Sequence, residues 1–307
     1  MFDVCLLGTG GMVPLPDRWL TSLLVRHNGS MILVDCGEGT QITLKKCGWG
    51  FKAIDALLFT HYHADHIAGL PGFLLTLGNS GREKPFTLIG PPGLKAVVQG
   101  LLVIAPQLPF EIHLLELPDN RITGFTFKDI NIESIPVEHW IPCLGYSFTI
   151  KRQGKFESSK AVELGIPKKF WKLLQDGEII RFEDRIFKPE MVLGPIRRGI
   201  KVSYCTDTRP VEGLIEFIQE SDLFICEGMY GDDSDYEKAL QKKHMLFSEA
   251  AGLAVKGNVK ELWLTHFSPA LDKPEDYLEA ASTIFQNTIA GHDIMVKQLK
   301  FSNFYTV

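Results

Sequence analysis

Short apolar runs alternate with segments of helical spacing along the first half of the chain. Three runs stop at glycine or polar residues and predict buried strands, at Val4–Leu7, Ala56–Phe59 and Phe86–Ile89. Apolar positions three and four apart predict helices at Thr40–Cys47, Ile67–Leu77 and Leu94–Leu102. Ser22–Arg26 and Met31–Val34 flank Asn28-Gly29, which favours a hairpin. The alternation over Phe125–Val137 is typical of half-buried strands.

The second half of the chain repeats this pattern. Its predicted strands are Lys201–Cys205, Leu223–Cys226, Glu261–Leu264 and one starting at Asp293–Val296, and its predicted helices are Val211–Gln219, Phe247–Val255 and Pro274–Gln286. Strands that alternate with helices indicate an α/β fold with sheets covered by helices. Four reactive side chains follow the carboxyl ends of predicted strands, where α/β proteins bind ligands: His61, Asp207, Glu227 and His266.

One short segment is dense in metal-ligand residues. Residues 60–66 read Thr-His-Tyr-His-Ala-Asp-His. Imidazole nitrogen and carboxylate oxygen suit zinc and other first-row divalent metals. Residues two apart in an extended loop point the same way, so His61 and His63 can bind one ion together. Asp65 and His66 continue past the turn towards a second ion. A loop of solvated histidines is the alternative, which this density disfavours.

Further ligands must come from distant parts of the chain. Among nine histidines, His139 and His266 each follow a predicted strand and are the best candidates. Asp207 also ends a strand, and a carboxylate there can bridge two ions. Taken singly, each has a structural alternative: the histidines as ordinary strand-end residues and Asp207 as a helix N-cap.

Composition narrows the class of protein. The chain has 307 residues, 45% of them hydrophobic, and a net charge of −5, which does not suggest a polyanion partner for the chain as a whole. Its six cysteines are scattered and indicate reduced thiols in a reducing compartment. The N-terminus shows no signal peptide and no apolar run suits a membrane helix, so we expect a cytoplasmic protein with no membrane partner.

Charge is unevenly distributed along the sequence. Residues 151–201 contain 13 Lys or Arg and seven Asp or Glu, a net charge of +6, whereas the rest of the chain carries −11. A basic segment on an acidic body suits contact with a phosphate backbone. Phe156, Phe170 and Trp171 lie among these charges and could stack or pack. The alternative is a solvated helical insertion that its aromatic residues dock to the body.

With these residues in place, the chain resembles the metallo-β-lactamase superfamily and, within it, the ribonuclease Z family, which removes 3′ trailers from precursor tRNA. Four stretches carry the resemblance. They are Leu-Gly-Thr-Gly-Gly at 7–11, Val-Asp-Cys-Gly-Glu-Gly-Thr-Gln at 34–41, residues 60–66 (called the metal loop below) followed by Gly69-Leu70-Pro71-Gly72, and Tyr-Cys-Thr-Asp-Thr-Arg-Pro at 204–210. The resemblance implies an αββα sandwich of two mixed sheets flanked by helices, with the metal site at one sheet edge. It implies one domain over residues 1–307 with a basic insertion or arm at about 151–200.

The resemblance also assigns roles to residues. It implies two Zn²⁺, although Mn²⁺ or another divalent metal would suit the same ligands. The first ion would be held by His61, His63 and His139, the second by Asp65, His66 and His266, and Asp207 would bridge them. Asp35 would orient a ligand histidine. Glu227 and His244 match the pair that delivers a proton to the leaving group, their alternatives being a surface carboxylate and a helix N-terminal residue.

The implied reaction is endonucleolytic cleavage of precursor tRNA by a metal-bridged hydroxide, with Asp65 accepting the proton of the attacking water. The family implies a homodimer. Pro16 and Trp19 stand where the family carries lysine and asparagine near Arg18, which keeps open a hydrolase of the same fold acting on a small phosphodiester or other ester. A metal-dependent binding protein without turnover is disfavoured by Glu227 and His244.

Overall fold

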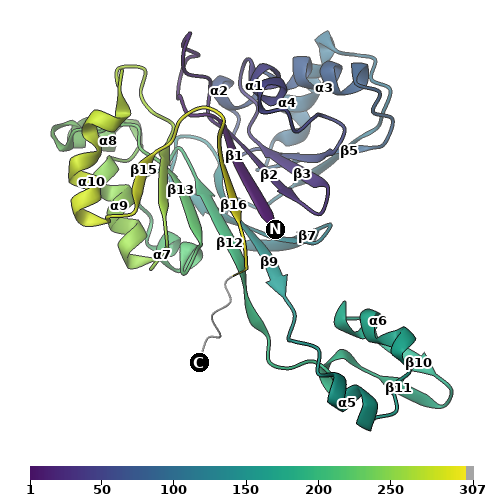
Figure 1. Ribbon diagram of the computed structural model, residues 1–307. Helices are drawn as coiled ribbons and strands as arrows, with labels where there is room; N and C mark the ends of the chain where they lie inside the picture. The colour runs from purple at the N-terminus through teal and green to yellow at the C-terminus, as the bar shows by residue number, and fades with distance from the viewer. Residues whose placement is uncertain (302–307) are drawn as a thin grey trace. The chain divides into compact units, whose positions relative to one another are not determined.

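The computed structural model describes residues 1–301, which form two compact units (Figure 1). The large unit comprises Met1–Thr149 and Lys201–Leu299, and the small unit comprises Ile150–Ile200 with Lys300 and Phe301. None of the described helices has the length and apolar character needed to cross a membrane.

The first sheet of the large unit is mixed. Its strands are β1 (Phe2–Gly8), β2 (Ser22–His27), β3 (Ser30–Val34), β4 (Ile54–Leu58), β5 (Phe86–Gly90), β6 (Ile112–Glu116) and β16 (Met295–Leu299). Their order is β16-β1-β2-β3-β4-β5-β6. The pairs from β16 to β3 are antiparallel, and the pairs from β3 to β6 are parallel.

The second sheet is also mixed. Its strands are β7 (Thr123–Phe127), β8 (Ile130–Val137), β9 (Cys143–Arg152), β12 (Arg197–Cys205), β13 (Leu223–Glu227), β14 (Leu262–Thr265) and β15 (Thr288–Ala290). Their order is β15-β14-β13-β12-β9-β8-β7. Strands β12 to β15 run parallel, so the carboxyl ends of β12, β13 and β14 meet at one edge.

Helices cover the outer faces of both sheets (Figure 1). The helices of the large unit are α1 (Thr40–Cys47), α2 (Ala64–Ile67), α3 (Leu70–Asn79), α4 (Leu94–Leu101), α7 (Glu212–Ile218), α8 (Tyr236–Lys242), α9 (Phe247–Lys256) and α10 (Leu278–Ile284). Buried side chains of α1, α3 and α4 share a core with the first sheet, and those of α7, α9 and α10 share another with the second sheet.

The two sheets pack against each other. In β1, Cys5 and Leu7 join the core under the helices, while the alternate residues Val4 and Leu6 are also fully buried. The hydroxyl of Tyr146 in β9 donates a 2.6 Å hydrogen bond to the carbonyl of Phe59, just after β4. The fold is therefore the αββα sandwich that the family resemblance implied.

Local differences from the predicted elements have identifiable causes. The segment predicted as one helix over Ile67–Leu77 is divided into α2 and α3, because Pro71 has no N–H and the Gly69 amide donates to Cys36 O. The segment Pro274–Gln286 contains a 3₁₀ turn at Pro274–Tyr277 before α10. In the large unit, strands β6, β9 and β15 and helix α8 (Tyr236–Lys242) were not predicted, and in the small unit no individual element was predicted.

The small unit has its own core. It contains α5 (Ser158–Glu163), α6 (Trp171–Gln175) and a hairpin of β10 (Ile180–Phe182) and β11 (Arg185–Phe187). Buried residues of these elements and of the segments beside them pack together: Ala161, Ile166, Leu174, Ile180, Phe187 and Val192. The aromatic residues Phe156, Phe170 and Trp171 pack against this core, with the Phe156 and Trp171 ring centroids 5.3 Å apart.

Candidate metal centre

The metal loop follows β4 and is held by a close backbone approach. Its residues His61 and His63 precede α2, and Asp65 and His66 lie within α2. The Cys36 amide donates to His66 O. A Cβ on Gly37 would lie 2.0 Å from Asp65 O, and a Cβ on Gly69 would lie 2.0 Å from Gly37 O. Glycine at these two places lets the loop after β3 lie against the metal loop.

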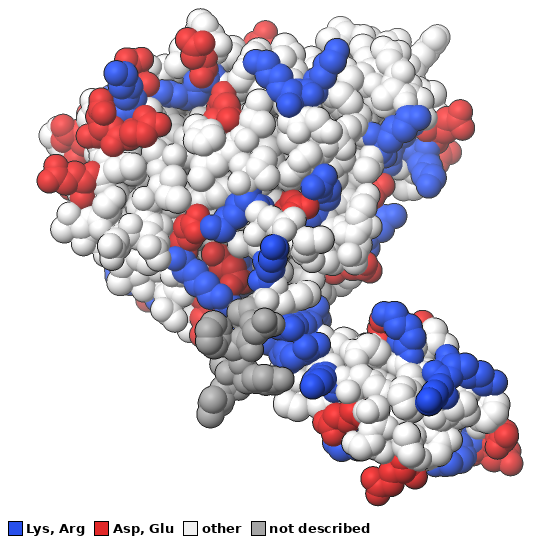
Figure 2. Space-filling model, in the orientation of Figure 1, with Lys and Arg blue, Asp and Glu red and all other residues white. Residues whose placement is uncertain are grey.

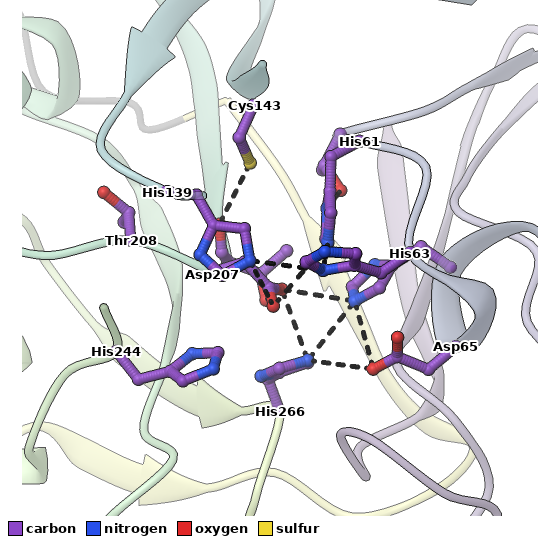
Figure 3. Close-up of polar contacts among 12 residues, drawn as sticks. His61, His63, Asp65, His139, Cys143, Asp207, Thr208, His244 and His266 are labelled. Carbon is purple, nitrogen blue, oxygen red and sulfur yellow. Dashed lines mark hydrogen bonds and ion pairs between the residues drawn. The ribbon is translucent and has the colours of Figure 1, made fainter. Parts of the chain in front are cut away.

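One group of donor atoms joins this loop to the second sheet. His61 Nε2 lies 3.0 Å from His63 Nδ1, and His139 Nε2 lies 3.2 Å from the same His63 atom. Asp207 Oδ1 lies 3.8 Å from both His61 Nε2 and His139 Nε2. The four donor atoms fall within 4.8 Å of one another (Figure 3).

A second group lies beside the first. His66 Nε2 is 3.3 Å from His266 Nε2, and Asp207 Oδ2 is 3.2 Å from each of these nitrogens. Asp65 Oδ2 is 3.5 Å from His66 Nε2 and 3.6 Å from His266 Nε2. Asp207 thus directs one carboxylate oxygen at each group, which is the geometry of a bridging ligand. All seven candidate ligands come together at one sheet edge, as predicted, and this cluster is called the metal rim below.

Asp35 fixes the orientation of two of these histidines. Its Oδ2 lies 2.9 Å from His66 Nδ1, and both carboxylate oxygens accept from the Thr60 hydroxyl. That hydroxyl lies 3.0 Å from His61 Nδ1. This network assigns the Nδ1 proton of each ring to the outer side, so that each Nε2 lone pair points inward. Asp35 thus has the orienting geometry that the resemblance implied for it.

The donor set fits divalent metal binding. Imidazole nitrogens 3.0 to 3.3 Å apart, several with inward lone pairs, repel one another unless a cation lies between them. Four ligands at zinc-like bond lengths around one tetrahedral ion would be about 3.3 Å apart, close to these separations. The N/O donor set matches first-row divalent ions. We conclude that this rim can bind divalent metal.

The electrostatics agree with a cation site. Burial lowers the pKa of His61, and it lowers that of His139 to about 4, so both rings are neutral donors. Burial also opposes a charge on His66, but Asp207 and Asp35 outweigh it and raise the pKa of His66 well above its usual value. The same two carboxylates would stabilise a metal ion in place of that proton.

Glu227 and His244 form a buried pair next to this rim. Glu227, at the end of β13, is fully buried and accepts hydrogen bonds from the Thr208 and Met245 amides. Its Oε2 lies 3.0 Å from His244 Nδ1. The His244 and His266 ring centroids are 5.5 Å apart, and both rings point into the same space in Figure 3. The predicted pair therefore faces the metal rim.

Burial alone would lower the pKa of His244. The charge of Glu227 and its hydrogen bond outweigh burial and raise the pKa to about 9. Glu227 therefore favours the protonated form of His244.

Some contributors to the site were not predicted. The Met12 amide donates a 2.7 Å hydrogen bond to Asp65 Oδ2. A Cβ on Gly11 would lie 2.8 Å from the His266 ring, so the glycine-rich turn after β1 serves this close approach. Arg209 forms an ion pair with Glu249 and donates to His244 O. The sequence signals for these contributors were the motifs at 7–11 and 204–210. The motifs were noted, but the contacts that their residues make could not be derived from the sequence.

The rim opens into a cavity of about 690 Å³. Its walls carry candidate ligands and His244, and also side chains from the loops after β8 and β13, from α8 and from the segment after β14: Trp140, Tyr230, Lys238, Lys242, Ser268, Pro269 and Ala270. This volume lies within the range of ligand sites that enclose a nucleotide-sized group.

Solved structures with this architecture define the class. The chain superposes on human tRNase Z, short form, with a TM-score of 0.71 and 24% identity over 97% of this chain and 100% of that chain. It superposes equally well on the metallo-β-lactamase fold protein YhfI from Bacillus subtilis, with 18% identity over 97% of this chain and 100% of the other. The fold is the metallo-β-lactamase fold.

Sequence comparison narrows this class. The chain is 55% identical to ribonuclease Z of Clostridium acetobutylicum over 99% of this chain and 100% of that protein, and 54% identical to ribonuclease Z of Lachnospira eligens over 99% of each. Residues 2–163 match the family model described as anti-Pycsar protein Apyc1. The chain belongs to the ribonuclease Z family, and its first half also carries the sequence pattern of the anti-Pycsar model.

Proposed function

We propose that this protein is a metal-dependent endoribonuclease that removes 3′ trailers from precursor tRNA. The observation that carries the proposal is the juxtaposition of two donor groups, joined by Asp207, with His244, paired to Glu227, in the wall of the same cavity. Full-length relatives named ribonuclease Z support the choice of substrate.

The cluster would hold two Zn²⁺. His61, His63 and His139 would bind one ion, Asp65, His66 and His266 the other, and Asp207 both. Two divalent cations supply an acidified water near neutral pH and neutralise charge on the phosphate oxygens. Mn²⁺ would suit the same oxygen and nitrogen donors.

Two side chains of the protein would move protons. Burial opposes the charge of Asp65, but His266 and His66 outweigh it and hold its pKa far below the usual range. Asp65 is thus an ionised carboxylate, as a metal ligand must be, and the Met12 amide orients it. It would accept the proton of the attacking water, because bound metal ions would make that water more acidic. As the new P–O bond forms and the bond from phosphorus to the 3′ oxygen breaks, His244 donates its proton to that oxygen. The products are a tRNA 3′-hydroxyl and a trailer with a 5′-phosphate.

The basic segment at about 151–200 would bind RNA as an insertion in a single hydrolase domain. Its net positive charge contrasts with the acidic remainder of the chain. Lys168 and Lys169 are exposed, and Lys169 Nζ lies 4.8 Å from the ring centroids of Phe170 and Phe182. These aromatic residues support the core of the unit, which leaves the cations to contact phosphates.

We further propose a cytoplasmic homodimer. All six cysteines are free thiols, and five of them are buried, which suits a reducing compartment. The homodimer is proposed because the chain belongs to the ribonuclease Z family.

The test is cleavage of a 3′-extended tRNA precursor by purified protein, with and without added Zn²⁺ or Mn²⁺, beside the Asp65→Ala variant. We expect metal-dependent cutting near the discriminator base that the variant loses. Hydrolysis of bis(p-nitrophenyl) phosphate without RNA cutting would retain the metal centre but reject tRNA as the substrate. Salt dependence also distinguishes precursor tRNA from a small ester as the substrate. RNA binding weakens steeply as the salt concentration rises, and small-ester turnover does not.

A further inference from the structure

Trp140 is exposed at the rim of the catalytic cavity. It is 62% exposed, although burying an indole normally stabilises a protein. The other four tryptophans, all within the described residues, are buried or half-buried. Trp140 directly follows the candidate ligand His139 and lines the same cavity as His244 and His266. An exposed aromatic face at this position is available to a substrate.

The loop that carries Trp140 is held in place from two sides. The Glu138 amide donates to the Thr208 hydroxyl at 3.0 Å, and the Arg209 amide donates to Glu138 O at 3.2 Å. From the end of α8, Lys243 Nζ lies 3.4 Å from His139 O and 3.5 Å from Glu138 Oε1. The indole is therefore presented by a braced loop, which lowers the entropy cost of binding to it.

Positive charge lies beside this indole, and Lys243 covers one of its two faces. Lys243 Nζ lies 4.9 Å from the Trp140 ring centroid, and Lys238 and Lys242, one helical turn apart on α8, also line the cavity. Lys243 adopts a left-handed conformation with φ of 58°, and it immediately precedes His244. Trp140 thus lies on the side of the cavity from which His244 would protonate the leaving oxygen.

We propose that Trp140 stacks on the nucleobase of the nucleotide that keeps the new 3′-hydroxyl, while the lysines of α8 contact neighbouring phosphates. This inference rests on the proposed function and adds a substrate-binding residue to it. Stacking on an aromatic side chain tolerates any base, so the subsite would hold the end of the tRNA without demanding one sequence.

The first experiment is a double-mutant cycle between protein and RNA. Wild type, Trp140→Phe and Trp140→Ala are compared on a precursor with an intact nucleotide before the cleavage site and on one with an abasic nucleotide there. On the intact precursor, Trp140→Ala should raise KM about 5- to 100-fold, and Trp140→Phe should recover part of the loss. On the abasic precursor, all three proteins should have similar KM.

A role in bracing Lys243 and His244 alone would give a different result. Trp140→Ala would then impair the intact and abasic precursors by the same factor, and this outcome would overturn the stacking proposal. An unchanged KM on the intact precursor would overturn it as well.

A binding measurement separates this inference from the proposed function. In the Asp65→Ala background, short single-stranded RNA should quench tryptophan fluorescence, and Trp140→Phe should abolish the quenching. Trp49→Phe is the matched control, since the Trp49 ring lies against Arg26 with 4.1 Å between the guanidinium carbon and the ring centroid. Quenching that survives in Trp140→Phe would reject the subsite. If quenching depends on Trp140 but the protein with Asp65 intact does not cleave the precursor, the subsite is retained and the proposed reaction is rejected.

Discussion

The large and small units use charged residues in opposite ways. In the large unit, Asp35 and Glu227 are fully buried and hold histidines and backbone amides at 2.8 to 3.0 Å. In the small unit, Lys160–Glu157 and Lys172–Asp176 form ion pairs along exposed helix turns. Lys, Arg, Asp and Glu side chains all appear on the visible face of this unit, which bears α5, α6, β10 and β11 (Figure 2).

Under the proposed function, this contrast would separate chemistry in the large unit from recognition in the small one. Buried charges interact strongly and shift pKa values, but each must be paired, so their positions are constrained. Exposed charges are screened by water and salt and contribute through their sum. We therefore expect single substitutions in the large unit to have large, specific effects, and substitutions in the small unit to have smaller effects that depend on salt.

The largest effect should come from His244→Ala. Loss of the proton donor should lower kcat on precursor tRNA about 10²- to 10⁴-fold with little change in bound metal. Because p-nitrophenolate leaves without protonation, hydrolysis of bis(p-nitrophenyl) phosphate should fall much less. Steady-state kinetics on both substrates and metal analysis by mass spectrometry check this. Loss of metal together with activity would instead make His244 a ligand, as the proximity of its ring to Asp207 and His266 allows.

The next effect concerns the residue that orients the ligands. Asp35→Asn should weaken metal binding about 10- to 100-fold, because the amide no longer holds the Nδ1 protons of His66 and, through Thr60, His61 in place. Competition with a chelator measures the affinity. The matched control is Asp55→Asn in β4, where Asp55 accepts a hydrogen bond from Ser30. Equal losses in both variants would show that Asp35 acts on general stability.

A smaller effect should appear in the pH dependence of Glu227→Gln. Burial lowers the pKa of His244 and Glu227 raises it, so removing the carboxylate charge should lower it from about 9. A proton donor works only below its pKa, so kcat should begin to fall at a lower pH than in wild type. The pH profile of kcat on precursor tRNA tests this. A shift towards higher pH, or none, would contradict the proposed role of the pair.

How far the sequence predicts this site depends on how local each part is. His61, His63, Asp65 and His66 share one loop, so their spacing alone identified them as metal-binding candidates. His139, Asp207 and His266 each lie on a separate loop and were only weak candidates until the family resemblance joined them. The hydrogen bond from the Met12 amide to Asp65 was not predicted, because a backbone donor has no sequence signature. The ion pair between Arg209 and Glu249 was not predicted either, because it depends on tertiary packing.

The fold shows the same limit. Strands β1, β4, β5 and β13 were predicted because they are short, continuous apolar runs buried on both faces. Strand β6 has an exposed apolar pattern at Leu114 and Leu115, and β15 is only three residues long, so neither gives a periodic signal. The small core of the 150–200 segment was not predicted, because its apolar residues are scattered among charges.

The smallest expected effect tests the small unit. Replacing Lys168 and Lys169 by glutamine removes two exposed charges and should weaken precursor tRNA binding about tenfold at low salt. The slope of log affinity against log salt should fall by about one for each phosphate that the variant no longer neutralises. The same double change at Lys95 and Lys256, exposed lysines of the large unit, is the control. If both double variants lose affinity equally, the effect is one of net charge, and the small unit has no special part in binding RNA. A loss confined to Lys168 and Lys169, with turnover of bis(p-nitrophenyl) phosphate retained, would assign recognition to the small unit and chemistry to the large one.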